Sequence, residues 1–216
     1  MKYHPLLVYA HILLMVFWLG TDVGVFIAGL FFLDPHRSLE RRRAAIELGL
    51  IVDRFPRICF VLMLPVGLQL AWQMGYLPVS TTFMGGIWAA SLAWLAVVLA
   101  IMRAHGTRRA AVLQRAERGF LALTIIALGG AVAALHGAAP GWLLGKLLAY
   151  AAICVCALLL EAAFAPALAA FAAIAAQGST PASEANLRRS MYWTYLWVLG
   201  IYLAVLVAGF LGTVKP

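Results

Sequence analysis

Three residues that could hold a cofactor lie within or at the ends of long apolar runs. They are the imidazoles of His11 and His136 and the amine of Lys146. Neutral imidazole is a common ligand of iron and copper. Haem in a helical bundle needs an axial histidine, an apolar slot and cations for its propionates. We therefore predict His11 as an axial metal ligand, His136 as the candidate second ligand, and Lys146 as a catalytic residue that acts as propionate partner or proton donor.

The apolar surroundings of His11 suit a macrocycle. Trp18 lies further along the same apolar stripe, so we expect it to contact the cofactor. His4 lies just outside the run, where it could help Lys146 to hold propionates. Structural roles stay open for all of these residues: a hydrogen bond to a neighbouring carbonyl for His11, an interfacial position for His136, and an amine that reaches the outer surface for Lys146.

A second polar group lies deeper in the apolar runs and contains charges of both signs. Its members are Asp22, Asp53, Arg54, Arg57 and Glu161. At about 1.5 Å of rise per residue, Asp22 lies about 16 Å from the inner end of its run and the two arginines about 14–18 Å from theirs. Because an unpaired buried charge is costly, we expect these charges to pair and Arg54→Leu to express poorly. The group is either structural, a proton path, or an arginine site for propionates or phosphate groups.

Apolar runs recur along the whole chain. Its 216 residues are 65% hydrophobic and 11% charged, whereas a soluble domain is about half apolar and about a quarter charged. A hydrocarbon core of about 30 Å needs about 20 apolar residues per helix. The first run has no small-residue cleavage site, so we expect it to stay as a helix. The sequence predicts one all-α domain over residues 1–216, a polytopic bundle with about six transmembrane helices at about 5–33, 45–76, 84–102, 119–135, 142–176 and 191–213.

Basic residues gather in alternate connections between these runs. The connections 34–44, 103–118 and 177–190 carry arginines, whereas 77–83 and 137–141 are uncharged. Basic loops stay cytoplasmic, so we expect both termini outside, periplasmic if the chain lies in a bacterial inner (plasma) membrane. The net charge of +8 is thus an orientation signal. Nucleic acid is excluded as a partner, because no aromatic and basic surface module is left to bind it.

Copper is the alternative to haem. It would prefer histidine together with methionine or cysteine, and no such sulfur lies clearly at the level of His11. The three cysteines, Cys59, Cys154 and Cys156, lie inside apolar runs without C-x-x-C spacing. We therefore interpret them as packing residues.

Three segments of this chain resemble parts of one membrane-protein superfamily. The run from His11 to Gly20, HILLMVFWLG, resembles the first span of HemJ-type membrane protoporphyrinogen oxidases and of the related copper-resistance CopD-like domains. The stretch Asp53–Arg57, DRFPR, is similar to the arginine-rich start of the family's second span. The stretch Gly141–Leu148, GWLLGKLL, is similar to its Gly-Trp-Leu-x-x-Lys segment.

The resemblance implies a b-type haem bound through His11, with Lys146 essential nearby. This chain also departs from the pattern, because the family has fewer spans. The family's later histidine has no counterpart in the segment Ala157–Glu161. The spans at 84–102 and 119–135, with His136, are not part of the pattern.

We therefore predict a haem b-binding integral membrane protein with a redox role, either an oxidoreductase of the protoporphyrinogen-oxidase-like type or an electron-transfer protein. It would pass electrons between the haem and a substrate or quinone. One alternative is a transporter of copper, haem or a small anion, in which the inner charged group lines the path. Another is a membrane anchor subunit whose haem relays electrons for a redox partner protein. The lipid bilayer is the first expected partner, and a homo-oligomer is compatible with the sequence.

Overall fold

The computed structural model describes residues 4–104 and 107–215, and it is all-α over those residues. The side chain of His4, which we expected near the propionates, lies outside the described part. Seven helices follow one another: α1 (His4–Leu33), α2 (Leu39–Val52), α3 (Arg54–Gln73), α4 (Thr81–Arg103), α5 (Arg108–Leu135), α6 (Gly141–Gln177) and α7 (Pro181–Val214). The predicted fold class, a polytopic helical bundle, is confirmed.

Six helical segments are long and apolar enough to cross a membrane, with α2 and α3 counted together as the single segment Leu39–Gln73. The two helices meet at Asp53, because Pro56 has no N–H to donate to the carbonyl of Val52 and so interrupts the ladder. The helices also extend beyond the apolar runs. Most notably, α7 begins at Pro181 instead of near residue 191, because Thr180 and Ser183 form a capping box at its start.

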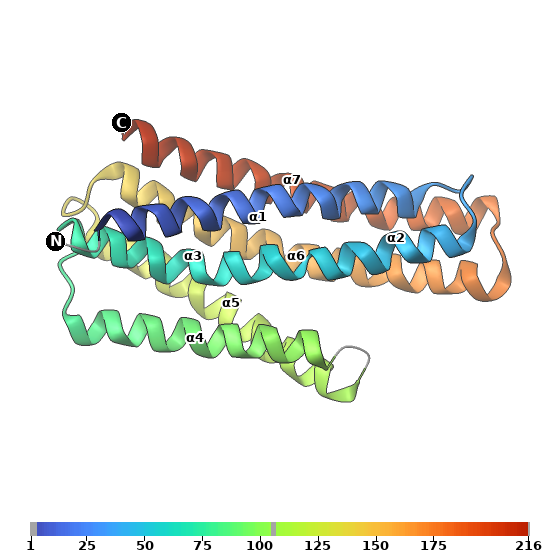
Figure 1. Ribbon diagram of the computed structural model, residues 1–216, viewed down its shortest axis with the longest axis horizontal. Coiled ribbons are helices and arrows are strands. Elements are labelled where there is room, and N and C mark those ends of the chain that lie inside the picture. Colours follow the sequence, from blue (N-terminus) through green and yellow to red (C-terminus); the bar gives the residue numbers. More distant parts are fainter. Residues whose placement is uncertain (1–3, 105–106, 216) are drawn as a thin grey trace.

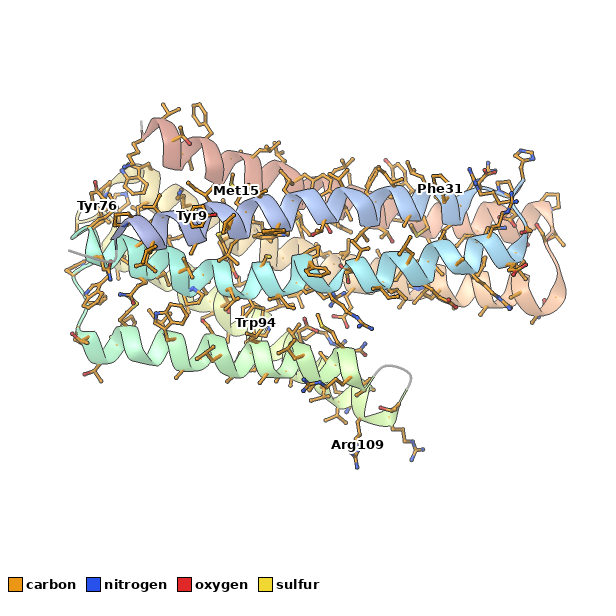
Figure 2. The ribbon with its side chains drawn as sticks, viewed as in Figure 1. Tyr9, Met15, Phe31, Tyr76, Trp94 and Arg109 are labelled. Carbon is orange, nitrogen blue, oxygen red and sulfur yellow. The ribbon has the colours of Figure 1, made fainter. Side chains whose placement is uncertain are left out.

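The three arginine-bearing connections lie on the same side of the bundle, with the α1–α2 and α6–α7 connections at its end and the α4–α5 connection short of that end (Figure 1). The α3–α4 and α5–α6 connections lie at the opposite end, where α1 begins and α7 ends. In Figure 2, Arg109 lies toward the first of these ends, and Tyr9 and Tyr76 lie at the second. We call these the basic end and the aromatic end. Alternate connections therefore share a side, as the charge pattern predicted.

The helices pack as two close pairs and a hairpin. α1 lies along α2 and α3, while α6 and α7 pack against each other along their length. The hairpin of α4 and α5 contacts α3 and α6, and it stops short of the basic end of the other helices (Figure 1). Contacts between α1 and α7 are sparse by comparison.

Aromatic rings around Phe60 form the centre of the bundle. The Phe60 ring centroid lies 5.3 Å from Trp18, 5.3 Å from Trp94 and 5.1 Å from Tyr150. The Tyr150 hydroxyl donates a hydrogen bond of 2.7 Å to the Phe60 carbonyl oxygen. Burying a tyrosine hydroxyl is tolerated only with such a partner. This cluster joins α1, α3, α4 and α6 at mid-height.

A buried ion pair closes the basic end. Arg42 of α2 is 2% exposed and Glu184 of α7 is 6% exposed. The guanidinium donates two hydrogen bonds to Glu184, of 2.7 and 2.9 Å, and a third of 2.8 Å from Nε to the Phe32 carbonyl oxygen. Ser179 donates a further bond of 2.8 Å to Glu184, and the Arg42 guanidinium carbon lies 5.2 Å from the Phe171 ring centroid. Arg42 thus links α1, α2, α6 and α7.

We expect Arg42→Met to lower the free energy of unfolding by about 3–5 kcal/mol, because it leaves Glu184 buried without a counter-charge. Chemical unfolding in mild detergent, followed by circular dichroism, measures this. The matched control is Arg43→Met at the exposed neighbouring position, expected to change stability by less than about 0.5 kcal/mol. The double variant Arg42→Met/Glu184→Met should regain most of the loss. Equal losses for Arg42→Met and Arg43→Met would contradict the assignment.

Candidate functional site

His11 presents a buried ring nitrogen that has no partner. Its Nδ1 atom is buried and accepts or donates no hydrogen bond within residues 4–104 and 107–215. The ring rests on α3 at Gly67, where an added Cβ would lie 3.1 Å from His11 Cε1. A larger residue at this position would require the imidazole to shift by a few tenths of an ångström. An unpartnered buried nitrogen is costly, so this atom is available to a ligand.

Lys146 approaches the same region from α6. Its amine lies against Gly212 of α7, in space that a Cβ at that position would fill. The ammonium nitrogen lies 5.9 Å from the Trp142 ring centroid, and that of Lys215 lies 5.4 Å from it. Lys146 and His11 are near enough for their charges to interact. His11 and Lys146 therefore lie within range of each other's charge, His11 beside a glycine of α3 and Lys146 beside a glycine of α7.

His136 does not join this pair. It follows the last residue of α5 and its side chain is exposed. α5 packs against α4 and α6, whereas α1 packs mainly against α2 and α3. The buried His11 Nδ1 has no contact of hydrogen-bonding length with it. The prediction of His136 as second axial ligand rested on a shared depth, and depth does not specify which helices are neighbours.

Trp18 belongs to the packed core. It is 6% exposed and packs with Cys59, Ile153 and Ile201. Side chains of the protein therefore cover its ring. Met15 lies between His11 and Trp18 on the same helix face, since residues four and seven apart align on a helix. The Met15 sulfur lies 3.7 Å from the position of an added Cβ at Gly209 of α7. A thioether therefore lies one turn from His11, which the sequence analysis did not recognise. Figure 2 labels Met15 on α1.

Arg57 is the centre of the inner charged group. Its Nε donates a hydrogen bond of 2.6 Å to Asp53, and its NH1 nitrogen lies 3.7 Å from Glu117 of α5. Glu161 of α6 is close enough to interact with the same guanidinium. It also lies 4.0 Å from the Nε atom of Arg118. The pairing that the sequence predicted for the group is therefore centred on Arg57, with carboxylates from three helices.

Arg54 has a different position from the one predicted. Its side chain is exposed, and no ion pair joins it to any residue that the structure describes. Asp53 and Arg57 are four residues apart and therefore face each other on the helix, whereas Asp53 and Arg54 are adjacent and do not. The partner role expected of Arg54 thus belongs to Arg57.

Asp22 completes the inner group from α1. It lines a cavity of about 100 Å³ together with Asp53 and Arg57. A second cavity lies near the surface of the basic end, lined by Arg43, Glu47 and Phe171 among others. His11 and Lys146 line neither of these two cavities. The described polar residues thus form two separate sites, one on each side of the aromatic cluster.

Sequence reasoning missed three charged residues that the structure pairs: Arg42, Glu184 and Glu117. All three lie in segments that the charge pattern predicts as basic loops but that are helical in the structure. For Glu117 a signal existed, because it lies about 13 Å beyond the start of α5 at 1.5 Å per residue. Arg42 carried no such signal, because Arg41 and Arg43 flank it, and Glu184 carried none because it lies in a polar connection.

Comparisons with known proteins find no match to this chain among family models, curated proteins or solved structures. Within the part of the chain that the structure describes, no three His, Cys, Asp or Glu side chains are grouped so that they could hold a metal ion. Fold and composition define the class, a multi-pass α-helical membrane protein.

We expect Arg57→Leu to destabilise the protein by about 1–3 kcal/mol more than Arg54→Leu, because it leaves Asp53 and Glu117 without their partner. The comparison holds charge and side-chain size constant, since both variants remove one guanidinium from the same helix. Thermal unfolding in detergent, monitored by loss of the monodisperse peak in gel filtration, measures it. If Arg54→Leu lowers the stability more than Arg57→Leu does, Arg57 is not the centre of this ion-pair network.

Proposed function

We propose that this chain is a haem b-binding integral membrane protein with a redox role, and that His11 is an axial ligand. The observation that supports this most directly is the buried and unpartnered Nδ1 atom of His11. An imidazole with a free nitrogen is the ligand that haem requires. An amine, Lys146, lies within charge-interaction range of it.

The donor set fits haem. His11 would supply the imidazole nitrogen that iron requires, and Lys146 a cation for a propionate. Haem, when bound, supplies one-electron chemistry. The chain's own residues then hold the group: His11 binds it, and Lys146 pairs with a propionate or delivers a proton. Because His136 is exposed, the second axial position is open to a substrate in this proposal.

The orientation follows from the charges at the two ends. Basic loops are retained on the cytoplasmic side, so the basic end faces the cytoplasm and the His11–Lys146 pair lies on the periplasmic side of a bacterial inner membrane. The resemblance to HemJ-type oxidases agrees with this arrangement, and it suggests a protoporphyrinogen-oxidase-like activity. A quinone or a redox partner protein would then exchange electrons with the haem.

An absorption spectrum of the purified protein tests the proposal. We expect a Soret band that shifts on reduction, and we expect His11→Ala to lose haem while keeping the fold, because the remaining contacts do not coordinate iron. The matched control is His136→Ala, expected to retain haem. Pyridine haemochrome analysis gives the haem content of each variant, and circular dichroism checks the fold. Unchanged haem content in His11→Ala would refute the ligand assignment.

Copper is a second candidate because the Met15 thioether lies one turn from His11. Imidazole with thioether sulfur is a donor set that copper accepts, and the chain would then serve copper transport. Elemental analysis separates the two candidates: a colourless protein that contains copper, and that loses it in Met15→Leu, would favour copper. Where haem is present, gentle purification tests for the anchor-subunit alternative through a stoichiometric partner.

A further inference from the structure

The inner cavity lies between five helices and is lined by both charged and apolar groups. Asp22 and Gly29 come from α1, Asp53 and Arg57 from the junction of α2 and α3, and Tyr195 from α7. Leu160 and Phe164 of α6 complete the wall. Its volume of about 100 Å³ is enough for several water molecules, and its polar lining makes hydration favourable.

The charges around this cavity do not balance if every group is ionised. The charged residues that line it are Asp22, Asp53 and Arg57, and Arg57 is bonded to Asp53. One carboxylate in the lining therefore lacks a counter-charge. A net negative charge buried within a membrane bundle is costly, so the group must take up protons or a cation.

Asp22 is the carboxylate with the weakest partners. No ion pair joins it to a described residue, whereas Asp53 and Glu117 contact Arg57 and Glu161 lies near Arg118. Its polar neighbours are the Tyr202 hydroxyl and the Asp53 carboxylate, which lines the same cavity. A neutral neighbour and a second acid do not compensate a buried negative charge, so Asp22 is the residue of the group that is best placed to hold a proton.

Two tyrosine hydroxyls beside the cavity have no partner. The hydroxyls of Tyr195 and Tyr202 are buried, and neither makes a hydrogen bond within the described part of the chain. Tyr202 lies close to the Asp22 carboxyl group, and Tyr195 lines the cavity. Buried hydroxyls are almost always satisfied by protein or by ordered water. Water in the cavity would satisfy both and would connect them to Asp22.

Arg57 forms part of the wall of this cavity. It lines the cavity, and its side chain is 44% exposed at the surface of the helix bundle.

We infer that the cavity is a hydrated proton-binding site in which Asp22 holds an exchangeable proton. The groups that face Asp22 are Asp53 and Arg57 from α2 and α3 and Tyr195 and Tyr202 from α7, with Glu161 on α6 beyond Arg57. This site is separate from His11 and does not depend on haem.

Infrared spectroscopy of the protein in lipid vesicles tests this inference. The wild type should show the C=O stretching band of a protonated carboxylic acid at neutral pH, and the band should shift to lower frequency in D₂O. Asp22→Asn, a nearly isosteric change, should remove it. Tyr202→Phe should keep the band but shift it, because the hydrogen bonding of the acid changes.

The matched control is Asp34→Asn in the α1–α2 connection. The His36 backbone N–H and the Arg37 guanidinium hold the pKa of Asp34 below its usual range, so this carboxylate is ionised at neutral pH and its loss should leave the band unchanged. Absence of the band in the wild type would overturn the inference, as would a band that survives Asp22→Asn. The vesicle buffer contains choline as its cation. If the band disappears when sodium replaces choline in the buffer, the site binds a cation instead of a proton. Loss of haem in His11→Ala affects none of these outcomes.

Discussion

The pair formed by Arg42 and Glu184 is the contact on which the basic end depends. Three of the five N–H groups of the guanidinium donate there to two carboxylate oxygens and the Phe32 carbonyl oxygen, so desolvation of the charge is offset by short, directed bonds. The bonds come from the end of α1, from α2 and from the start of α7, and Phe171 of α6 packs against the guanidinium. Four helix termini are thereby held in one relative position.

With that end closed, the inward face of α1 carries two polar sites with an apolar barrier between them. His11 and Asp22 are separated along the helix by about 16 Å at 1.5 Å per residue. Trp18 lies between them and packs on Phe60 at the centre of the bundle. Within this barrier the Tyr150 hydroxyl is bonded to the backbone, whereas the buried indole nitrogen of Trp94 has no partner among the residues that the structure describes. The aromatic packing thus separates the two polar sites along α1.

Much of the fold could be predicted from the sequence, because apolar runs of sufficient length allow few alternatives in a bilayer. The alternation of basic connections likewise predicted which connections share an end. Helix ends were less predictable: α7 begins in a segment whose charges resemble a loop, and the capping box at Thr180 is visible only as two small hydroxyl residues. His11 and Lys146 could be singled out because each is the only basic side chain or histidine inside its apolar run. Arg54 and Arg57 could not be distinguished, because only the rotation of the helix relative to Asp53 decides which of them faces that carboxylate. For His136 the sequence gives only a depth in the membrane, and depth alone does not show which helices are neighbours.

The unequal lengths of the helices give the molecule a tapered outline. α4 has 23 residues and α6 has 37, and the α4–α5 hairpin ends well before the basic end (Figure 1). At the aromatic end the cross-section contains all six membrane-spanning segments, whereas at the basic end it contains α1, α2, α6 and α7. At about 1.5 Å per residue, α4 is already long enough to cross a hydrocarbon core of about 30 Å. The additional length of α1, α2, α6 and α7 therefore extends beyond the bilayer at the basic end and places the Arg42–Glu184 pair in the part of the molecule that projects from the membrane.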